Sequence, residues 1–188
     1  MISISNLRLV RGLHSVAENF SATLGSGQGA WLLGANGSGK TSLLRSIAGL
    51  LPPVAGSLKV DSQFIYIGSI AGHDATLTTQ ENLEFWCAIN NTDVLPAGVA
   101  LEHAGLTRMS DKRADSLSAG QAQRLALARL LCAHAKLWLL DEPFSSLDAA
   151  GCEWLKSLLL KHFKDGGSAV IATHQTYEIP NMQSWVMS

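Results

Sequence analysis

The chain has 188 residues, enough for one substantial folded domain and too few for two of ordinary size. Its 14 Lys and Arg against 15 Asp and Glu give a formal charge of -1, which excludes the broad positive field that a nucleic-acid-binding protein needs. Hydrophobic residues make up 47% of the chain and charged residues only 15%, so we expect a membrane protein or a second copy to cover part of the surface.

We expect the chain to reside in the cytosol. Its apolar runs are strand-length, far below the roughly 20 residues that cross a bilayer. Residues 1–11 alternate apolar and polar side chains, which is not the pattern of a signal peptide. Cys87, Cys132 and Cys152 are widely spaced, which predicts reduced structural thiols and neither a disulfide framework nor a zinc site.

Short apolar segments alternate with helical ones, which predicts an α/β domain on a largely parallel sheet. Residues 30–33 predict the first core strand, and apolar residues at helical spacing over 43–51 predict a helix ended by Pro52 and Pro53. Between them the chain contains GANGSGKTS, which fits the pattern G-x-x-x-x-G-K-[ST]. A bare glycine-rich turn is the alternative, but the flanking strand and helix favour phosphate binding.

This glycine loop predicts a site for a nucleotide polyphosphate and Mg²⁺. Its glycines let backbone N–H groups turn toward phosphates at the N-terminus of the helix. Lys40 supplies positive charge, Thr41 supplies a hydroxyl ligand for Mg²⁺, and Ser42 supplies a hydroxyl within reach of the phosphates. The predicted phosphate-binding residues are Gly34, Ala35, Asn36, Gly37, Ser38, Gly39, Lys40, Thr41 and Ser42.

The middle of the chain changes from strand signals to helix signals. Residues 58–60 and 64–67 predict strands. Residues 78–105 are mainly helical, and Thr78 with Glu81 predicts a capping box at the start of that segment.

A predicted strand further along ends in two carboxylates. Residues 137–140 are apolar, and Asp141 and Glu142 follow at the carboxyl end of the strand, where parallel sheets bind ligands. We expect Asp141 to join the Mg²⁺ shell and Glu142 to orient and deprotonate an attacking water as general base. Two solvated acids are the alternative, which the phosphate loop on the same chain disfavours.

The last predicted elements are a helix over residues 149–163 and a core strand over residues 169–173. Gly166 and Gly167 break the pattern between them. His174 follows the strand directly, and a structural histidine is the alternative to a functional one there.

The chain resembles the ABC ATPase family through LSAGQ at residues 117–121, with alanine in place of the commoner third-position glycine. This motif opens a helix predicted over residues 118–133, so Ser118 and the following backbone N–H groups form a second anion site; a plain helix cap is the alternative. The resemblance implies a P-loop NTPase of ABC ATPase architecture. That fold has a mostly parallel core sheet, a small antiparallel β subdomain and a helical signature subdomain.

The resemblance also implies how the motifs share the work. A second copy would complete an ATP sandwich, in which Ser118, Gly120 and Gln121 serve the partner's nucleotide. Asp148 ends a run, SLD, that resembles the family's D-loop at that interface, and His174 resembles its switch histidine, which contacts the γ-phosphate. We expect residues 1–188 to form one nucleotide-binding domain, with residues 78–133 or so as the helical subdomain inserted in a RecA-like core.

Two positions depart from the family pattern. Arg11 stands where many members stack an aromatic ring on adenine, and its guanidinium plane can stack on a base; a solvated Arg is the alternative, and His14 is a less well-placed substitute. Ser69 stands where the family carries a glutamine that touches Mg²⁺ and faces the transport partner. Because serine is shorter, its metal contact would be water-mediated or absent, and His73 is displaced from this position.

One branch of the family is similar in further detail, the ATP-binding export subunits of cytochrome c maturation. The shared runs are YIG at 66–68, LT at 77–78, ENLEF at 81–85, LWLLDEPF at 137–144 and ATHQ at 172–175. This similarity implies ATP hydrolysis on integral membrane permease subunits, at the cytoplasmic face of the inner membrane, driving release of haem-loaded chaperone or haem export. We expect no direct haem binding, because no CxxCH motif or histidine ligand spacing is present.

Three alternative functions follow from the same residues. A subunit of another small ABC importer or exporter shares the chemistry and differs only in its partner. ABC proteins of DNA repair or translation have a long coiled coil or two cassettes in tandem, and the span between Lys40 and Ser118 leaves no room for a coiled coil. A nucleotide-binding scaffold without hydrolysis is suggested by the two departures and opposed by Glu142 and His174.

Overall fold

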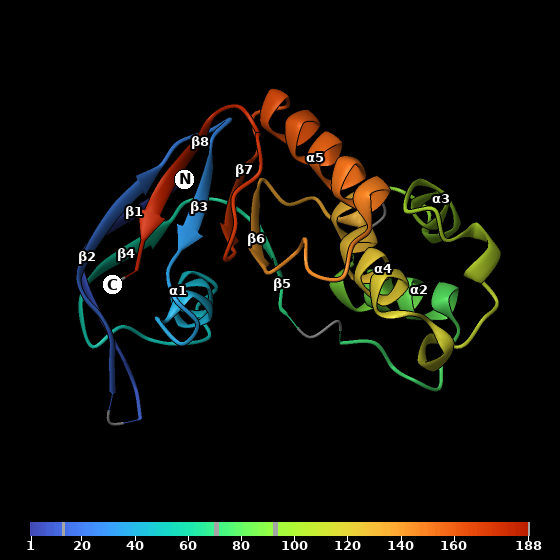
Figure 1. Cartoon of the computed structure of the whole chain (residues 1–188), viewed down its shortest axis with the longest axis horizontal. Helices are drawn as coiled ribbons and strands as arrows, with labels where there is room; N and C mark the ends of the chain where they lie inside the picture. The colour runs from blue at the N-terminus through green and yellow to red at the C-terminus, as the bar shows by residue number, and fades with distance from the viewer. Residues whose placement is uncertain (13, 70–71, 92–93, 188) are drawn as a thin grey trace. The chain divides into compact units, whose positions relative to one another are not determined.

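Figure 1 shows the computed structural model, which describes residues 1–12, 14–69, 72–91 and 94–187. Unit 1 consists of Met1–Tyr66, Ala135–Glu142 and Leu158–Ser188. Unit 2 consists of Ile67–His134 and Pro143–Ser157. The chain therefore passes from one unit to the other directly after Glu142.

Unit 1 contains an antiparallel sheet in the order β2-β1-β4. Its strands are β1 Ile2–Arg11, β2 His14–Leu24 and β4 Ala55–Val60. The alternation of buried and exposed residues in β1 shifts at Asn6, where φ is 48° and the register with β2 changes. Because of this irregularity, apolar residues on both sides of it are buried, namely Ile2, Ile4, Leu7 and Leu9.

The second sheet has the strand order β5-β6-β7-β3-β8. Its strands are β3 Gly29–Leu33, β5 Phe64–Ile67, β6 Leu137–Asp141, β7 Ser168–Ala172 and β8 Met182–Val186. The pairs β6–β7, β7–β3 and β3–β8 are parallel. Strands β6 and β7 are buried along their whole length, as central strands of a parallel sheet are. The predicted parallel core sheet with a small antiparallel sheet is confirmed.

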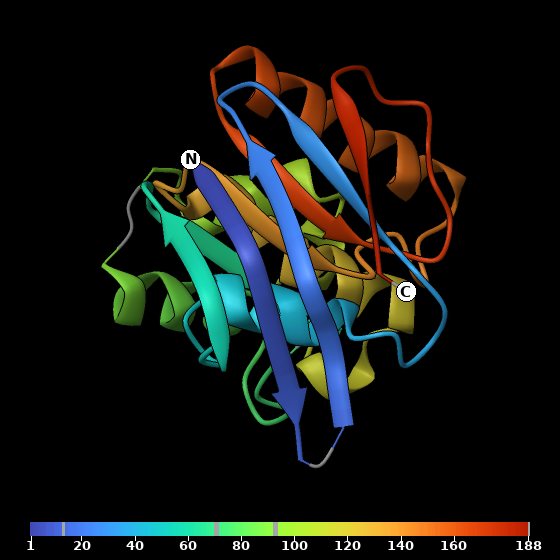
Figure 2. The same cartoon turned by 90° about the vertical axis from the view of Figure 1, so that its left-hand side faces the viewer.

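Helix α1, Lys40–Ile47, packs into the core of unit 1. In Figure 2 it lies behind the strands of the antiparallel sheet. Its Leu43 and Leu44 belong to the same buried cluster as Leu9 of β1 and Leu139 of β6. The helix that opens with the phosphate loop is therefore held from both sheets of the unit.

In unit 1 the structure adds strands β1, β2 and β8, for which no residue range was predicted, and it shortens the first predicted helix. The first helix ends at Ile47 and not at residue 51, because Gly49 adopts a φ of 73° and the Leu50 amide donates to the Arg45 carbonyl, which closes the helix end. Strand β8 was not predicted. It is a mostly exposed edge strand with one buried residue, Trp185, so it carries neither an apolar run nor a regular alternation.

Unit 2 is built around helices. They are α2 Thr79–Asn90, α3 Ala97–His103, α4 Ala119–Cys132 and the first part of α5 Ala149–Lys164, with short 3₁₀ turns at Thr107–Met109 and Ala114–Ser116. Their buried cluster contains Leu83, Leu101 and Leu125. The predicted capping box of Thr78 and Glu81 is confirmed at the start of α2. Within the described ranges, no helix is both long enough and apolar enough to cross a bilayer.

Candidate nucleotide site

The phosphate loop follows β3 and runs into α1, as the motif requires. At two of its glycines, neighbouring atoms leave no room for a side chain. A Cβ on Gly34 would lie 2.8 Å from the Met187 carbonyl oxygen, and a Cβ on Gly39 would lie 2.7 Å from the Val16 carbonyl oxygen. Gly39 is the N-cap of α1 with a φ of 99° and supplies no side-chain cap. The first-turn N–H groups of α1 thus keep their capacity to bind an anion.

Lys40 is folded back over this loop. Its Nζ donates to the carbonyl oxygens of Gly34 at 2.7 Å and Ala35 at 3.0 Å, and the residue is buried. The loop carbonyls therefore hold the ammonium group at the loop itself, where a bound phosphate would compete for it.

Thr41 and Asp141 meet at the end of β6. The Thr41 hydroxyl Oγ1 donates to Asp141 Oδ2 at 2.8 Å, and Asp141 is only 2% exposed. Burial raises the pKa of this carboxyl, the Thr41 hydrogen bond opposes that shift, and Glu142 adds to it. A hydroxyl and a carboxylate are the oxygen donors that Mg²⁺ prefers, so the pair fits that ion. Among the described residues, no cluster of three or more His, Cys, Asp or Glu offers a fuller protein cage.

Glu142 and His174 form a second pair at the same edge of the sheet. Glu142 adopts a φ of 51°, uncommon for a residue with a side chain, and its amide donates to the Ala172 carbonyl at 2.8 Å. Its Oε2 lies 3.1 Å from His174 Nδ1. The backbone of β7 thus fixes Glu142 where the chain leaves the strand, and the imidazole contacts its carboxylate.

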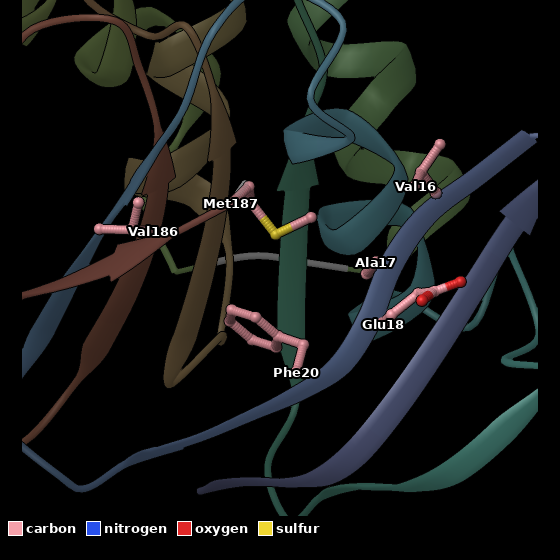
Figure 3. Close-up of a pocket in the computed structure, with 6 residues that line it drawn as sticks. All are labelled: Val16, Ala17, Glu18, Phe20, Val186 and Met187. Carbon is pink, nitrogen blue, oxygen red and sulfur yellow. The ribbon is translucent and has the colours of Figure 1, made fainter.

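A pocket adjoins the phosphate loop in unit 1. Figure 3 shows its lining: Val16, Ala17, Glu18 and Phe20 from β2, with Val186 and Met187 from the end of the chain. Val16 and the Met187 methyl also neighbour the position of a Cβ on Gly39, which places the pocket beside the loop. Sequence reasoning missed these residues, of which all but Glu18 are apolar, because no motif marks them.

The predicted adenine contact lies beside the turn of the same hairpin, two strand positions from Val16. Arg11 is the last residue of β1, pairs in register with His14, and is exposed. His14 is exposed as well. The structure therefore brings Val16 to the phosphate loop, while Arg11 stands at the strand end five positions earlier in the chain.

Unit 2 contains the other predicted contacts. Ser118 Oγ accepts from the Gln121 amide at 3.3 Å, and Gln121 Oε1 accepts from the Ser118 amide at 2.9 Å, so both side chains form the capping box of α4. Asp148 Oδ1 accepts from Arg124 Nη2 at 2.6 Å. Ser69 is exposed beyond the end of β5.

Each unit thus gathers one set of predicted residues. Unit 1 gathers the phosphate loop, Asp141, Glu142 and His174, and its parts come from separate segments of the chain. Unit 2 gathers the signature residues and Asp148. Arg124, which sequence reasoning did not single out, joins the second set through its bond to Asp148.

Comparison with known proteins gives consistent results. A sequence profile of the family described as ABC transporter matches residues 17–145. The cytochrome c biogenesis ATP-binding export protein CcmA of Cereibacter sphaeroides is 44% identical over 174 residues, which cover 92% of this chain and 82% of that protein.

Two solved structures share the fold. An ABC transporter ATP-binding protein of Pyrococcus furiosus superposes with a TM-score of 0.86 at 20% identity, covering 99% of this chain and 96% of that one. A dimeric ATP-binding cassette bound to ADP and Pi superposes with a TM-score of 0.83 at 24% identity, covering 93% of this chain and 88% of that one.

Proposed function

This chain belongs to the ABC transporter family and is an ABC-type ATPase, and from that premise we propose that it drives a membrane complex of c-type cytochrome biogenesis. The hydrolytic role rests on one arrangement in unit 1. Asp141 at the end of β6 bonds to Thr41 in the first turn of α1, directly after the phosphate loop. Glu142 follows the same strand and contacts His174, which lies just beyond β7. The biogenesis role rests on the 44% identity to the Cereibacter protein, which extends over most of both chains.

The phosphate loop would receive the β- and γ-phosphates of ATP. Backbone N–H groups at the start of α1 would donate to them, and Lys40 would exchange its two carbonyl partners for phosphate oxygens. This exchange favours the bound state, because a phosphate oxygen carries the charge that a carbonyl lacks.

Thr41 and Asp141 would hold Mg²⁺ when it is bound with the nucleotide. The ion supplies charge neutralisation at the phosphates.

Glu142 would perform the proton transfer. As water oxygen attacks the γ-phosphorus, the bond to the bridging oxygen of ADP breaks and the water proton passes to the Glu142 carboxylate. His174 would orient that carboxylate through Nδ1, at 3.1 Å, and contact the γ-phosphate.

The base would lie against the apolar wall next to the loop. Val16, Phe20 and Met187 offer that wall, and Arg11 would stack on the open face of the adenine. The apolar residues on one face of the base and Arg11 on the other would together replace the single aromatic ring that many members of the family stack on adenine.

A second copy would supply the remaining contacts. ABC cassettes pair with one another and with membrane permeases, and the solved cassette bound to ADP and Pi is a dimer. Ser118, Gly120, Gln121 and Asp148 are proposed to face the nucleotide of the partner copy. Residues 1–188 would then act as one nucleotide-binding domain, with its helical signature part at about residues 78–133.

The permease would dock on an apolar face of α2. Phe85 and Ile89 lie one turn apart on this helix and are 58% and 64% exposed. Exposed large apolar side chains at this spacing are suited to a hydrophobic partner, and the family's partner is an integral membrane protein. The chain would thereby be held at the cytoplasmic face of the inner membrane.

Affinity purification from detergent-solubilised membranes tests two proposals: that the chain works in c-type cytochrome biogenesis, and that its permease docks on helix α2. The wild-type chain should retain a multi-span permease of the cytochrome c maturation system, and the Phe85→Ser, Ile89→Ser double variant should lose most of it. Leu50→Ser is the matched control, because Leu50 is 66% exposed but lies in unit 1. Retention of the permease by the double variant would reject the docking face. A permease of another importer or exporter would instead assign the chain to that system.

A further inference from the structure

The segment that follows Glu142 contacts one face of helix α4 at three points. Gln123 Nε2 donates to the Pro143 carbonyl at 3.0 Å, and Arg124 Nη2 donates to Asp148 Oδ1 at 2.6 Å. Between these bonds, a Cβ on Gly120 would lie 2.7 Å from the Ser146 carbonyl oxygen. Positions 120, 123 and 124 share one face of a helix, so the three contacts form a continuous seam.

The α4 side of this seam is buried. Gln123 is 6% exposed, and its bond satisfies a backbone carbonyl that the irregular segment leaves without a ladder partner. The Arg124 side chain is 18% exposed and also approaches the Ala104 carbonyl, at 3.4 Å. Both donor side chains are therefore largely shielded from solvent where they meet the segment.

The segment itself is held in a restricted conformation. Ser146 adopts a φ of 64°, and Asp148 Oδ1 also accepts from the Gly151 amide at 2.8 Å, which starts helix α5. These bonds from Gly151 and Arg124 lower the pKa of the Asp148 carboxyl. One carboxylate thus joins the start of α5 to the signature helix.

The boundary between the two units falls directly before this segment, in agreement with its contacts to α4. Pro143–Ser157 belongs to the same unit as α4, whereas Glu142 belongs to the unit of the phosphate loop. The D-loop is therefore built on the signature helix of its own chain, although it follows the general base directly in sequence.

We propose that Gln123 and Arg124 are positioning residues that fix the D-loop to the signature helix, so that Ser118 and Asp148 approach the partner copy's nucleotide as one body. This inference rests on the proposed paired ATPase. Neither residue touches the nucleotide in this scheme. Each acts through the segment that it holds, and losing either should release the D-loop without unfolding α4.

A native thiol reports on this segment. Cys152 Sγ lies 4.0 Å from the Leu147 carbonyl oxygen and is partly buried, while Cys132 is fully buried. In a Cys87→Ala background, we expect Arg124→Gln to raise the rate of Cys152 labelling by maleimide about fivefold or more, a local-opening effect. Asp148→Asn should raise the Cys152 labelling rate less than Arg124→Gln does, because asparagine keeps an acceptor for the Gly151 amide.

The matched control is Arg113→Gln. Arg113 makes an exposed ion pair with Asp115 at 3.2 Å, and both residues precede helix α4 in the same unit. It should leave the Cys152 labelling rate unchanged, and circular dichroism would verify that every variant is folded. An Arg124→Gln rate within twofold of wild type would overturn the proposal.

Steady-state ATPase kinetics provide a second test of the proposal. Arg124→Gln should lower kcat for ATP more than it raises KM, because the lost positioning acts on the assembled pair. Faster labelling with unchanged kcat would refute the functional half of the inference. If the wild-type chain hydrolysed no ATP, the labelling result would still decide the positioning claim.

Discussion

Asp141 and Glu142 are adjacent carboxylates in unlike surroundings. Asp141 ends β6, is 2% exposed and bonds to Thr41, whereas the Glu142 side chain is 24% exposed and bonds to His174. The φ of 51° at Glu142 explains the difference, because it turns the chain out of the strand at that residue. Two neighbouring acids can therefore take separate tasks, one at the metal and one at the water proton.

Glu142→Gln should abolish turnover while leaving nucleotide binding intact. The amide keeps the shape of the side chain but cannot accept the water proton, so we expect kcat to fall by about 10²-fold or more. A phosphate-release assay measures kcat, and a fluorescent ATP analogue measures binding. Glu178→Gln, which neutralises an exposed carboxylate in the same unit, should behave as wild type. Undiminished hydrolysis by the Glu142 variant would refute the general-base role.

Among single residues, the sequence predicted those whose residue type and spacing belong to a recognisable motif. Lys40 and Thr41 are adjacent in a recognisable loop, and Asp141 follows an apolar strand. The contact of Thr41 with Asp141 spans 100 positions but follows from the parallel sheet. Val16 and Met187 could not be found in this way, because apolar residues near a site differ in no local feature from those of the core.

At the scale of elements, two helical glycines in unit 2 differ in their surroundings. A Cβ on Gly98 in α3 would meet nothing within 4 Å, whereas a Cβ on Gly120 in α4 would press on the Ser146 carbonyl oxygen at 2.7 Å. Gly98→Ala should therefore raise the free energy of unfolding by about 0.5–1 kcal/mol through helix propensity. Gly120→Ala should lower it by about 1–3 kcal/mol through overpacking. Urea unfolding of both variants checks the prediction, which equal effects of the same sign would contradict.

Helix α5 and strand β6 meet through a half-buried imidazole. The His162 ring stacks on Trp138 with centroids 3.7 Å apart, and burial lowers its pKa from the ordinary 6.5 to about 4. The unfolded chain binds a proton at this ring below about pH 6.5, while the folded protein does so only near pH 4. The folded state should therefore lose stability as pH falls through that window, and the loss should level off below it.

His162→Phe tests this linkage. Phenylalanine can keep the stacking on Trp138 but does not titrate, so the thermal midpoint of the variant should fall less than that of wild type between pH 6.5 and about 4. Differential scanning calorimetry over this range measures both curves, and the groups common to the two proteins cancel in the comparison. Parallel curves would show that His162 contributes nothing to the acid sensitivity.

Element prediction succeeded where a local signal marks the element and failed where strand pairing alone determines it. Strands β6 and β7 are continuous apolar runs, and α4 begins at a capping box, so both kinds of signal are local. Strand β8 is stabilised by pairing with β3 and has a mixed composition, so its partner and not its sequence makes it a strand.

At the scale of the whole molecule, the two sets of nucleotide contacts lie in different units of the chain. The phosphate loop belongs to unit 1 and the signature residues to unit 2. If the signature serves the nucleotide of a second copy, as proposed, ATP becomes part of the interface between the two copies. Hydrolysis then removes the γ-phosphate contact that holds the copies together. Assembly should then depend on intact nucleotide and on turnover being blocked.

Glu142→Gln should accordingly dimerise with ATP and Mg²⁺, because the nucleotide persists at the interface. Light scattering after size exclusion should show the mass doubling with ATP and remaining monomeric with ADP. Adding Lys40→Ala should abolish the dimer, since this change removes the ammonium that the loop carbonyls hold ready for phosphate. Lys59→Ala, which removes an exposed lysine paired with Asp61, is the charge-matched control and should leave it intact. A dimer that formed equally well with ADP would mean that contacts other than the γ-phosphate hold the copies together.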